Sequence, residues 1–538
     1  MTQPHVAPYG SWKSPITSDL IVSATVGLRQ TALDGEETYW VELRPSEGGR
    51  NCVVRRTPDG SVSDVTPQGF DARTRVHEYG GGDFAVRDGE VYFVNFADQR
   101  VYRQRAGTAP RALTPEGKLR YSDLVIDPSR GRLYAVREDH SDESREAVNT
   151  LVTFDAAGAS GGDGGSVIAS GHDFYSTPRL SPDGSRLAWL AWSHPNLPWD
   201  GCELWLGELN ADGSVRSPRR AAGGAEESIF QPEWSPGGAL YFVSDRNNWW
   251  NIYRLNEDGG AEAVYESEAE FGLPQWLFGM STYAFASDGL VVCAFARRGD
   301  WGLGLLDTRR KSFERVELPY TDITYVRADA TRAVFRAGSP TVRASVVELD
   351  LETRAVKVLR RPSETAVDPD YVSTPRAVEF PTEGGRTAHA FYYPPRNRDF
   401  AAPEGECPPL LVKCHSGPTS AATSMLRLDT QYWTSRGIAV LDVNYGGSTG
   451  YGREYRRRLN GEWGVVDVDD CVNGAKHLIK QGEVDPARCV ITGGSAGGYT
   501  TLNALTFRDT FRAGASHYGV SDLTVFVGDT HKFESRYL

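Results

Sequence analysis

The chain has 538 residues, too many for one hydrophobic core, so two or three domains are expected. Its net charge is −13 without a basic block, which argues against a nucleic-acid partner. No apolar run approaches the length of a membrane span, and residues 1–13 lack the pattern of a secretory signal, so we expect no membrane association. The seven scattered cysteines predict reduced thiols in a cytoplasmic protein.

Residues 1–365 are predicted to form an all-β domain. Short alternating strands, such as 187–192 and 203–209, are separated by Gly, Pro, Asp and Asn turns. A turn that opens an apolar strand recurs at equal intervals of 54 residues, beginning at residues 127, 181 and 235. Weaker copies begin at residues 88, 287 and 329.

This repeat favours a β-propeller. Periods of about 40–55 residues are typical of four-stranded blades, and the length of the region then gives about seven blades with an N-terminal extension. An array of β-sandwiches is the alternative, but a single recurring turn–strand unit favours the propeller.

Three propeller segments resemble binding sites, although ordinary structural roles are favoured for each. The segment 75–82 is polar and glycine-rich, Glu226 and Glu227 could hold a peptide amino terminus, and Trp249-Trp250 could form a binding platform. We expect a blade turn, a solvated loop and packing between blades instead, because exposed charge and core aromatics are common.

Residues 366–538 are predicted to form an α/β domain. The polar segment 360–369 contains two prolines and indicates a domain boundary. After it, apolar strands alternate with helices, as in a doubly wound, mostly parallel sheet. The buried-type strands are expected at 410–414, 437–444, 489–494 and 513–518.

The sequence around Ser495 has the pattern of a nucleophile elbow. A β-branched run leads into Gly493-Gly494-Ser495-Ala496-Gly497, and a helical segment follows. Such a strand–turn–helix places the serine hydroxyl at the top of the sheet of an α/β-hydrolase. Ser495 is therefore the predicted nucleophile, and the N–H of Ala496 is the predicted first donor to the oxyanion.

The loop 415–418 is the predicted source of the second oxyanion donor, from the backbone N–H of Ser416 or Gly417. His415 precedes the nucleophile, whereas α/β-hydrolases have the order Ser, Asp, His, so it is not the expected base. A contact with substrate or a role in shaping the loop is expected for His415 instead.

These motifs together resemble the prolyl oligopeptidase family of serine peptidases. The matching segments are 493–499 (Gly-Gly-Ser-x-Gly-Gly-Tyr), 415–418 (His-x-Gly-Pro), 444–452 and 484–488. Within the family the chain most resembles the acylaminoacyl-peptidase and dipeptidyl aminopeptidase branch. The resemblance implies that the propeller caps the active site, that the substrates are short peptides, and that Ser495 attacks the scissile carbonyl.

The resemblance also implies a catalytic Asp and His on loops well beyond the nucleophile, and the chain has only 43 residues after Ser495. Asp529 and His531 are in the right order but too close together in sequence to lie on different loops. Asp522 and His517 offer no better pair. We expect the triad Asp and His to be absent from this chain, with the last strands of the sheet. An incomplete sheet predicts self-association, for example as a homo-oligomer.

Two further functions are weighed against a serine peptidase that forms an acyl-enzyme. One is a propeller interaction protein with a vestigial hydrolase domain, and the other is a carboxylesterase. The sequence has neither a His-Glu-x-x-His motif nor a Cys/His cluster, so no metal and no organic cofactor are expected.

Overall fold

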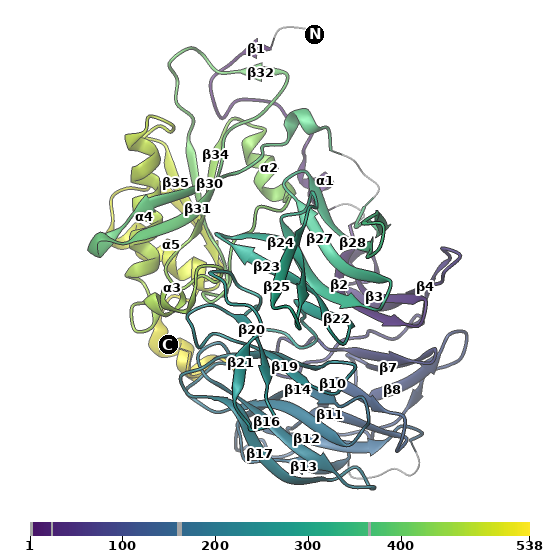
Figure 1. The fold of residues 1–538 in the computed structure, drawn as a ribbon. Coiled ribbons are helices and arrows are strands. Elements are labelled where there is room, and N and C mark those ends of the chain that lie inside the picture. Colours follow the sequence, from purple (N-terminus) through teal and green to yellow (C-terminus); the bar gives the residue numbers. More distant parts are fainter. Residues whose placement is uncertain (1–3, 23–24, 159–163, 364–366, 538) are drawn as a thin grey trace.

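A computed structural model describes the chain except for residues 1–3, 23–24, 159–163, 364–366 and 538. It contains a propeller followed by an α/β domain, here called the hydrolase domain (Figure 1). The predicted boundary between residues 365 and 366 lies outside the described residues.

The propeller has seven four-stranded antiparallel blades, which confirms the predicted fold. Each blade uses four consecutive strands. Blades 1–4 comprise β2 (Gly27–Asp34), β3 (Glu37–Arg44), β4 (Arg50–Arg56), β5 (Val62–Asp64); β6 (Phe84–Arg87), β7 (Glu90–Val94), β8 (Val101–Arg105), β9 (Arg111–Ala112); β10 (Leu119–Asp127), β11 (Arg132–Asp139), β12 (Val148–Asp155), β13 (Ser166–Ala169); β14 (Phe174–Leu180), β15 (Arg186–Trp192), β16 (Cys202–Leu209), β17 (Val215–Gly224). Blades 5–7 comprise β18 (Ile229–Trp234), β19 (Leu240–Ser244), β20 (Asn251–Leu255), β21 (Ala261–Ala263); β22 (Tyr283–Ser287), β23 (Leu290–Arg297), β24 (Asp300–Asp307), β25 (Ser312–Val316); β26 (Asp322–Ala328), β27 (Arg332–Ser339), β28 (Val342–Asp350), β29 (Val356–Arg360).

The sequence repeat corresponds to one structural position. Every copy is the turn that joins the first and second strands of a blade, from blade 2 to blade 7. In the turn at Asp127 the carboxylate accepts a hydrogen bond from the Ser129 N–H at 3.0 Å, and Asp329 accepts one from the Thr331 N–H at 2.8 Å. Asp and Asn favour such turns because their side chains bond to the backbone two residues further on.

The ring is closed by packing between blades 1 and 7, since no strand is shared between them. Trp40 and Val334 belong to one buried cluster at this junction. The Thr31 hydroxyl donates to the Tyr325 carbonyl at 2.6 Å. This non-covalent closure holds the seven inner strands around a common channel.

Two loops meet at the end of this channel that faces the hydrolase domain. One joins blades 1 and 2, and the other joins blades 5 and 6. Gly81 and Phe278 form a β-bridge between these loops, and the Phe278 N–H donates to the Gly80 carbonyl at 3.0 Å. His77, in the first loop, contacts Phe533 of the hydrolase domain at 5.5 Å between ring centroids. The segment 75–82 is therefore more than a blade turn.

The hydrolase domain contains a six-stranded sheet in the order β30-β31-β34-β33-β35-β36. The last four strands in this order are parallel, as predicted. The strands are β30 (Arg376–Pro381), β31 (Thr387–Tyr393), β33 (Leu410–Cys414), β34 (Ala439–Asn444), β35 (Cys489–Gly494) and β36 (Ala513–His517). The helices are α2 (Leu428–Thr434), α3 (Arg453–Arg456), α4 (Val466–Lys480), α5 (Ala496–Phe507) and α6 (Leu523–Asp529), with short 3-10 turns at Pro369–Tyr371, Glu383–Gly385 and Arg457–Leu459. A further 3-10 turn, Pro45–Glu47, lies in blade 1 of the propeller.

The N-terminal segment lies against the hydrolase domain, although it precedes the propeller in sequence (Figure 1). Its β1 (His5–Val6) pairs in parallel with β32 (Phe400–Ala401), and α1 (Ser18–Val22) follows. The Gly10 N–H donates to the Arg436 carbonyl at 3.1 Å. The chain therefore enters and leaves the propeller from the same side.

Strand β36 forms one edge of the sheet, and all five of its residues are exposed. Tyr518 and Phe507 nearby are 84% and 66% exposed. An unpaired edge beside exposed aromatics favours association with another polypeptide.

None of the described helices is long and apolar enough to cross a membrane. All seven cysteines are unbridged, and six of them are buried.

Candidate active site

Ser495 lies in the sharp turn between β35 and α5. Its backbone has φ 53° and ψ −121°, a conformation that few non-glycine residues adopt. The Ser495 N–H donates to the His517 carbonyl at 3.1 Å, which fixes the turn against β36. The side chain is half-buried, and among the described residues its hydroxyl makes no hydrogen bond that caps α5.

Glycines make this turn sterically feasible. A Cβ atom at Gly497 would lie 2.3 Å from the Cys414 carbonyl oxygen, and one at Gly493 would lie 2.3 Å from the Gly497 carbonyl oxygen. These contacts are with backbone atoms, which cannot move aside as a flexible side chain could. The close approach of α5 to β33 therefore requires glycine at both positions.

The predicted oxyanion loop, defined here as residues 415–419 and called the oxyanion loop below, follows β33 and lies beside the turn at Ser495. The Ser416 hydroxyl donates to the Gly494 carbonyl at 3.0 Å, so the loop is tied to the residue before Ser495. Gly417 has φ +63°, which favours glycine. Ala496 is the first residue of α5, so its N–H has no acceptor within the helix and is available to an oxyanion.

His415 is turned away from a base position and towards the loop that follows β34. Its Nε2 lies 2.7 Å from the Ser448 hydroxyl, and its ring stacks on Tyr445 with centroids 4.4 Å apart. Burial lowers the pKa of His415, which favours the neutral imidazole. Within the described part of the chain His415 makes no hydrogen bond to Ser495, which agrees with a role in shaping the loop.

The far end of the oxyanion loop is held by two aromatic residues. The Trp276 indole N–H donates to the Thr419 carbonyl at 2.7 Å, and the Tyr537 hydroxyl donates to Thr419 Oγ1 at 2.5 Å. Trp276 belongs to the propeller loop that carries Phe278, so one loop closes the channel and also contacts the candidate active site. A Cβ at Gly417 would lie 3.6 Å from the Trp276 ring.

The His and Asp residues after Ser495 have other roles. The Asp522 carboxylate caps α6 by accepting from the Thr524 N–H at 2.8 Å. His531 lies 3.6 Å from Glu534. His517 is exposed, and its backbone carbonyl contacts the elbow. Within the described part of the chain, no hydrogen bond connects these residues or Asp529 to the Ser495 hydroxyl.

The acidic and tryptophan pairs of the propeller contact charged residues of both domains. Glu226 forms an ion pair with Arg457 of the hydrolase domain. Glu227 pairs with Arg246 at 2.7 Å. Trp250 is only 1% exposed, and the Arg456 guanidinium lies 4.1 Å from its ring centroid. The contacts of Glu226 and Trp250 cross the junction of the two domains, whereas that of Glu227 with Arg246 lies within the propeller.

Comparisons with known proteins agree with this architecture. Residues 424–538 match the model of the prolyl oligopeptidase family. A crystal structure of puromycin hydrolase is 39% identical, with a TM-score of 0.95, and the superposition covers 99% of this chain and 83% of that chain. The chain belongs to the prolyl oligopeptidase family.

Two further proteins are similar to this chain, one over nearly its whole length and one over part of it. A puromycin-hydrolyzing peptidase of Mycobacterium tuberculosis is 40% identical, with a TM-score of 0.94 and coverage of 99% of this chain and 83% of that chain. Dipeptidyl aminopeptidase BIII of Pseudoxanthomonas mexicana is 34% identical over 154 residues, which are 28% of this chain and 22% of the relative. The match to this curated relative thus spans about a fifth of its length.

Several residues that shape the site were not identified from the sequence. Tyr445 and Ser448 lie in the motif 444–452, so their proximity to the active site could have been inferred from it. Trp276 offered no such signal, because it lies in a propeller loop distant in sequence from Ser495.

Proposed function

We propose that this protein is a serine peptidase that cleaves short peptides through an acyl-enzyme. The observation that carries the proposal is the placement of Ser495, on a strained turn, between the free N–H of Ala496 and the oxyanion loop. Two backbone donors on either side of an attacking hydroxyl are the arrangement that stabilises a tetrahedral oxyanion.

In this mechanism the Ser495 hydroxyl oxygen attacks the scissile carbonyl, and its proton passes to a histidine. The N–H groups of Ala496 and of Ser416 or Gly417 hold the oxyanion. The protonated histidine then donates to the leaving amine, and water hydrolyses the acyl-enzyme. We propose that this histidine and its aspartate lie outside residues 1–538, because none of the described His and Asp residues after Ser495 is hydrogen-bonded to its hydroxyl, and His531 and Asp522 contact other groups. His415 would influence substrate binding indirectly, because its bond to the Ser448 hydroxyl fixes the loop that faces the substrate.

Fluorophosphonate labelling tests this proposal, because these probes react with a serine that is activated by a base. The 538-residue chain should fold without being labelled, and a form extended beyond residue 538 should be labelled at Ser495. The Ser495→Ala variant of the extended form is the control. Labelling of the 538-residue chain would show that His517, His531 or a second chain supplies the base.

Failure of the folded, extended form to react would refute the peptidase proposal and favour a propeller interaction protein. Substrate panels then separate the remaining classes. N-acetyl-alanine anilide, Ala-Ala anilide and puromycin represent acylated, free dipeptidyl and aminoacyl amide substrates. A clear preference for p-nitrophenyl esters over all of these amides would indicate a carboxylesterase.

A further inference from the structure

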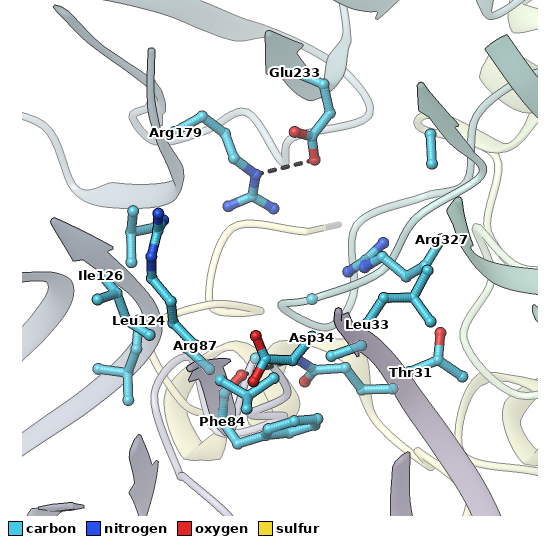
Figure 2. Close-up of a pocket in the computed structure, with 18 of the residues that line it drawn as sticks. Thr31, Leu33, Asp34, Phe84, Arg87, Leu124, Ile126, Arg179, Glu233 and Arg327 are labelled. Atoms are coloured by element: carbon cyan, nitrogen blue, oxygen red, sulfur yellow. Dashed lines mark hydrogen bonds and ion pairs between the residues drawn. The ribbon is translucent and has the colours of Figure 1, made fainter. Parts of the chain in front are cut away.

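A cavity of about 700 Å³ opens at the end of the propeller channel that faces away from the hydrolase domain (Figure 2). All seven blades line it through their first strands. Strand β14 shows the direction, since it begins at Phe174, whose ring lies 5.6 Å from that of Phe533 in the hydrolase domain. The same strand reaches the cavity at Arg179, near its other end.

The floor of the cavity is closed by backbone. Gly82 and Gly279 line it, and a Cβ at Gly279 would lie 3.0 Å from the Gly82 Cα. Directly beside them, the β-bridge between Gly81 and Phe278 joins the two loops. The cavity is therefore separated from Ser495 by this pair of loops, and it is distinct from the candidate active site.

Three guanidinium groups point into the cavity from different blades, those of Arg87, Arg179 and Arg327 (Figure 2). Arg179 is already compensated, since its Nε lies 3.1 Å from Glu233 and its Nη1 lies 3.6 Å from Asp123. Arg87 lies at the exposed rim, 3.7 Å from Asp88.

Arg327 differs from the other two. Its Nη1 donates to the Val326 carbonyl at 2.9 Å, and no carboxylate among the described residues lies within 4.0 Å of its guanidinium. Burial lowers the pKa of Arg327, and the positive charge of Arg179 lowers it further, while the more distant carboxylates of Glu233 and Asp123 oppose this shift. Asp34, which also faces the cavity, uses both carboxylate oxygens to accept backbone N–H groups, from Asp88 at 3.0 Å and Gly89 at 2.7 Å.

We propose that this cavity is a second ligand site, in which Arg327 binds an oxyanion of the carboxylate or phosphate class. Planar guanidinium groups bind both kinds of oxyanion in a bidentate manner. A partly buried guanidinium without a directly paired carboxylate carries a desolvation cost that a bound anion offsets. The volume is in the range that accommodates a small ligand, so the oxyanion can belong to free phosphate or to the C-terminus of a short peptide. The proposal requires no catalysis by Ser495.

Isothermal titration calorimetry of the 538-residue chain, near neutral pH and at low salt, tests this site. The probes are inorganic phosphate, Gly-Gly-Gly and Gly-Gly-Gly amide. Binding should be saturable and become about tenfold weaker or more in Arg327→Gln. Arg310→Gln is the matched control, because Arg310 is 84% exposed and lies 3.8 Å from its nearest carboxylate; it should bind like the wild type.

Preference for the tripeptide over its amide would identify a peptide carboxylate as the ligand, and binding of phosphate alone would identify a free anion. Absence of saturable binding by the wild type at millimolar concentrations, or equal binding by Arg327→Gln, would overturn the proposal. If that variant does not fold, modification of the wild type by phenylglyoxal replaces it. The bound probe should then protect Arg327 but not Arg310, and equal modification of Arg327 with and without probe would refute the site.

Discussion

Ser495 combines a strained backbone with close contacts to neighbouring glycines, and this combination makes the elbow sensitive to single methyl groups. Gly497→Ala would place a Cβ 2.3 Å from the Cys414 carbonyl oxygen. We expect the free energy of unfolding to fall by about 1–3 kcal/mol, as for overpacked cores. Urea unfolding monitored by circular dichroism measures this. Gly528→Ala is the control, because its Cβ would meet nothing within 4 Å. Equal stability of the two variants would contradict the proposed packing.

Ser495, Ala496, Ser416 and Gly417 could be chosen as candidates from the sequence because their signals are local. A turn of this type requires small residues at fixed offsets from the serine, so a few consecutive residues are enough to recognise it. The supporting contacts are different. The bond from Trp276 to Thr419 joins two domains, and no spacing or periodicity in the sequence encodes such a contact.

His77 provides a prediction on pH. It is 5% exposed, and burial among aromatic rings lowers its pKa to about 4. An unfolded histidine has a pKa of about 6.5, so below that pH the unfolded chain binds a proton that the native chain excludes. The contribution of His77 to stability is therefore constant above pH ~6.5 and decreases as the pH falls towards 4, by up to about 3 kcal/mol.

The matched comparison is His77→Asn, since Asn does not titrate and tolerates the positive φ of 54° at this position. Other titrating groups act equally on both proteins and cancel in the difference. Urea unfolding at several pH values should show that the wild type loses more stability than the variant between pH ~6.5 and ~4. Parallel pH profiles would contradict the prediction, because they would show that the pKa of His77 is the same in the native and unfolded chains.

At the scale of elements, each copy of the sequence repeat marked one turn of a blade and not the blade's four strands. The turn between the first two strands depends on Asp, Ser and Gly at fixed positions, so it recurs in the sequence. The third and fourth strands vary more, because only their alternation of buried and exposed residues is required. The loops between blades carry no repeat, which is why the contact between Gly81 and Phe278 was not foreseen.

The loop between blades 5 and 6 should control the order of the oxyanion loop. Trp276→Phe removes the indole donor to the Thr419 carbonyl but retains an aromatic ring. We expect faster amide hydrogen exchange in residues 415–420, since a loop with fewer anchors opens more often. Mass spectrometry of peptic peptides measures this. Trp205→Phe is the control, because the Trp205 indole bonds to Glu203 on the same strand, within blade 4. Unchanged exchange at 415–420 would show that the loop is held without Trp276.

At the scale of the whole molecule, the two domains are joined by more than the two chain crossings. Segment 4–22 packs on the hydrolase domain. The C-terminal region packs on the propeller, where the Lys532 ammonium donates to the carbonyls of Ala147 and Asp173 at 2.9 and 2.8 Å. The order of domains could be predicted from the sequence, but this exchange of terminal segments could not, because it depends on contacts between residues hundreds of positions apart.

Asp245 forms deeply buried ion pairs at this junction. Its carboxylate, on the propeller, bonds to Arg453 and Arg456 of α3, and the three side chains are 0%, 10% and 2% exposed. Asp245→Asn leaves two guanidinium groups without the carboxylate to which both are bonded. Because breaking a buried pair from one side is costly, the free energy of unfolding should fall by about 3–5 kcal/mol.

Limited proteolysis distinguishes loss of the domain junction from general destabilisation. In Asp245→Asn, cleavage should become faster at the segments that cross between the domains, near residues 360–370, while the blades remain resistant. Glu226→Gln is the control, because Glu226 also pairs with α3's neighbour Arg457 across the junction but is 80% exposed. Water screens that pair, so its loss should change neither stability nor cleavage measurably. If both variants behaved alike, the buried carboxylate would not be what holds the propeller and the hydrolase domain together.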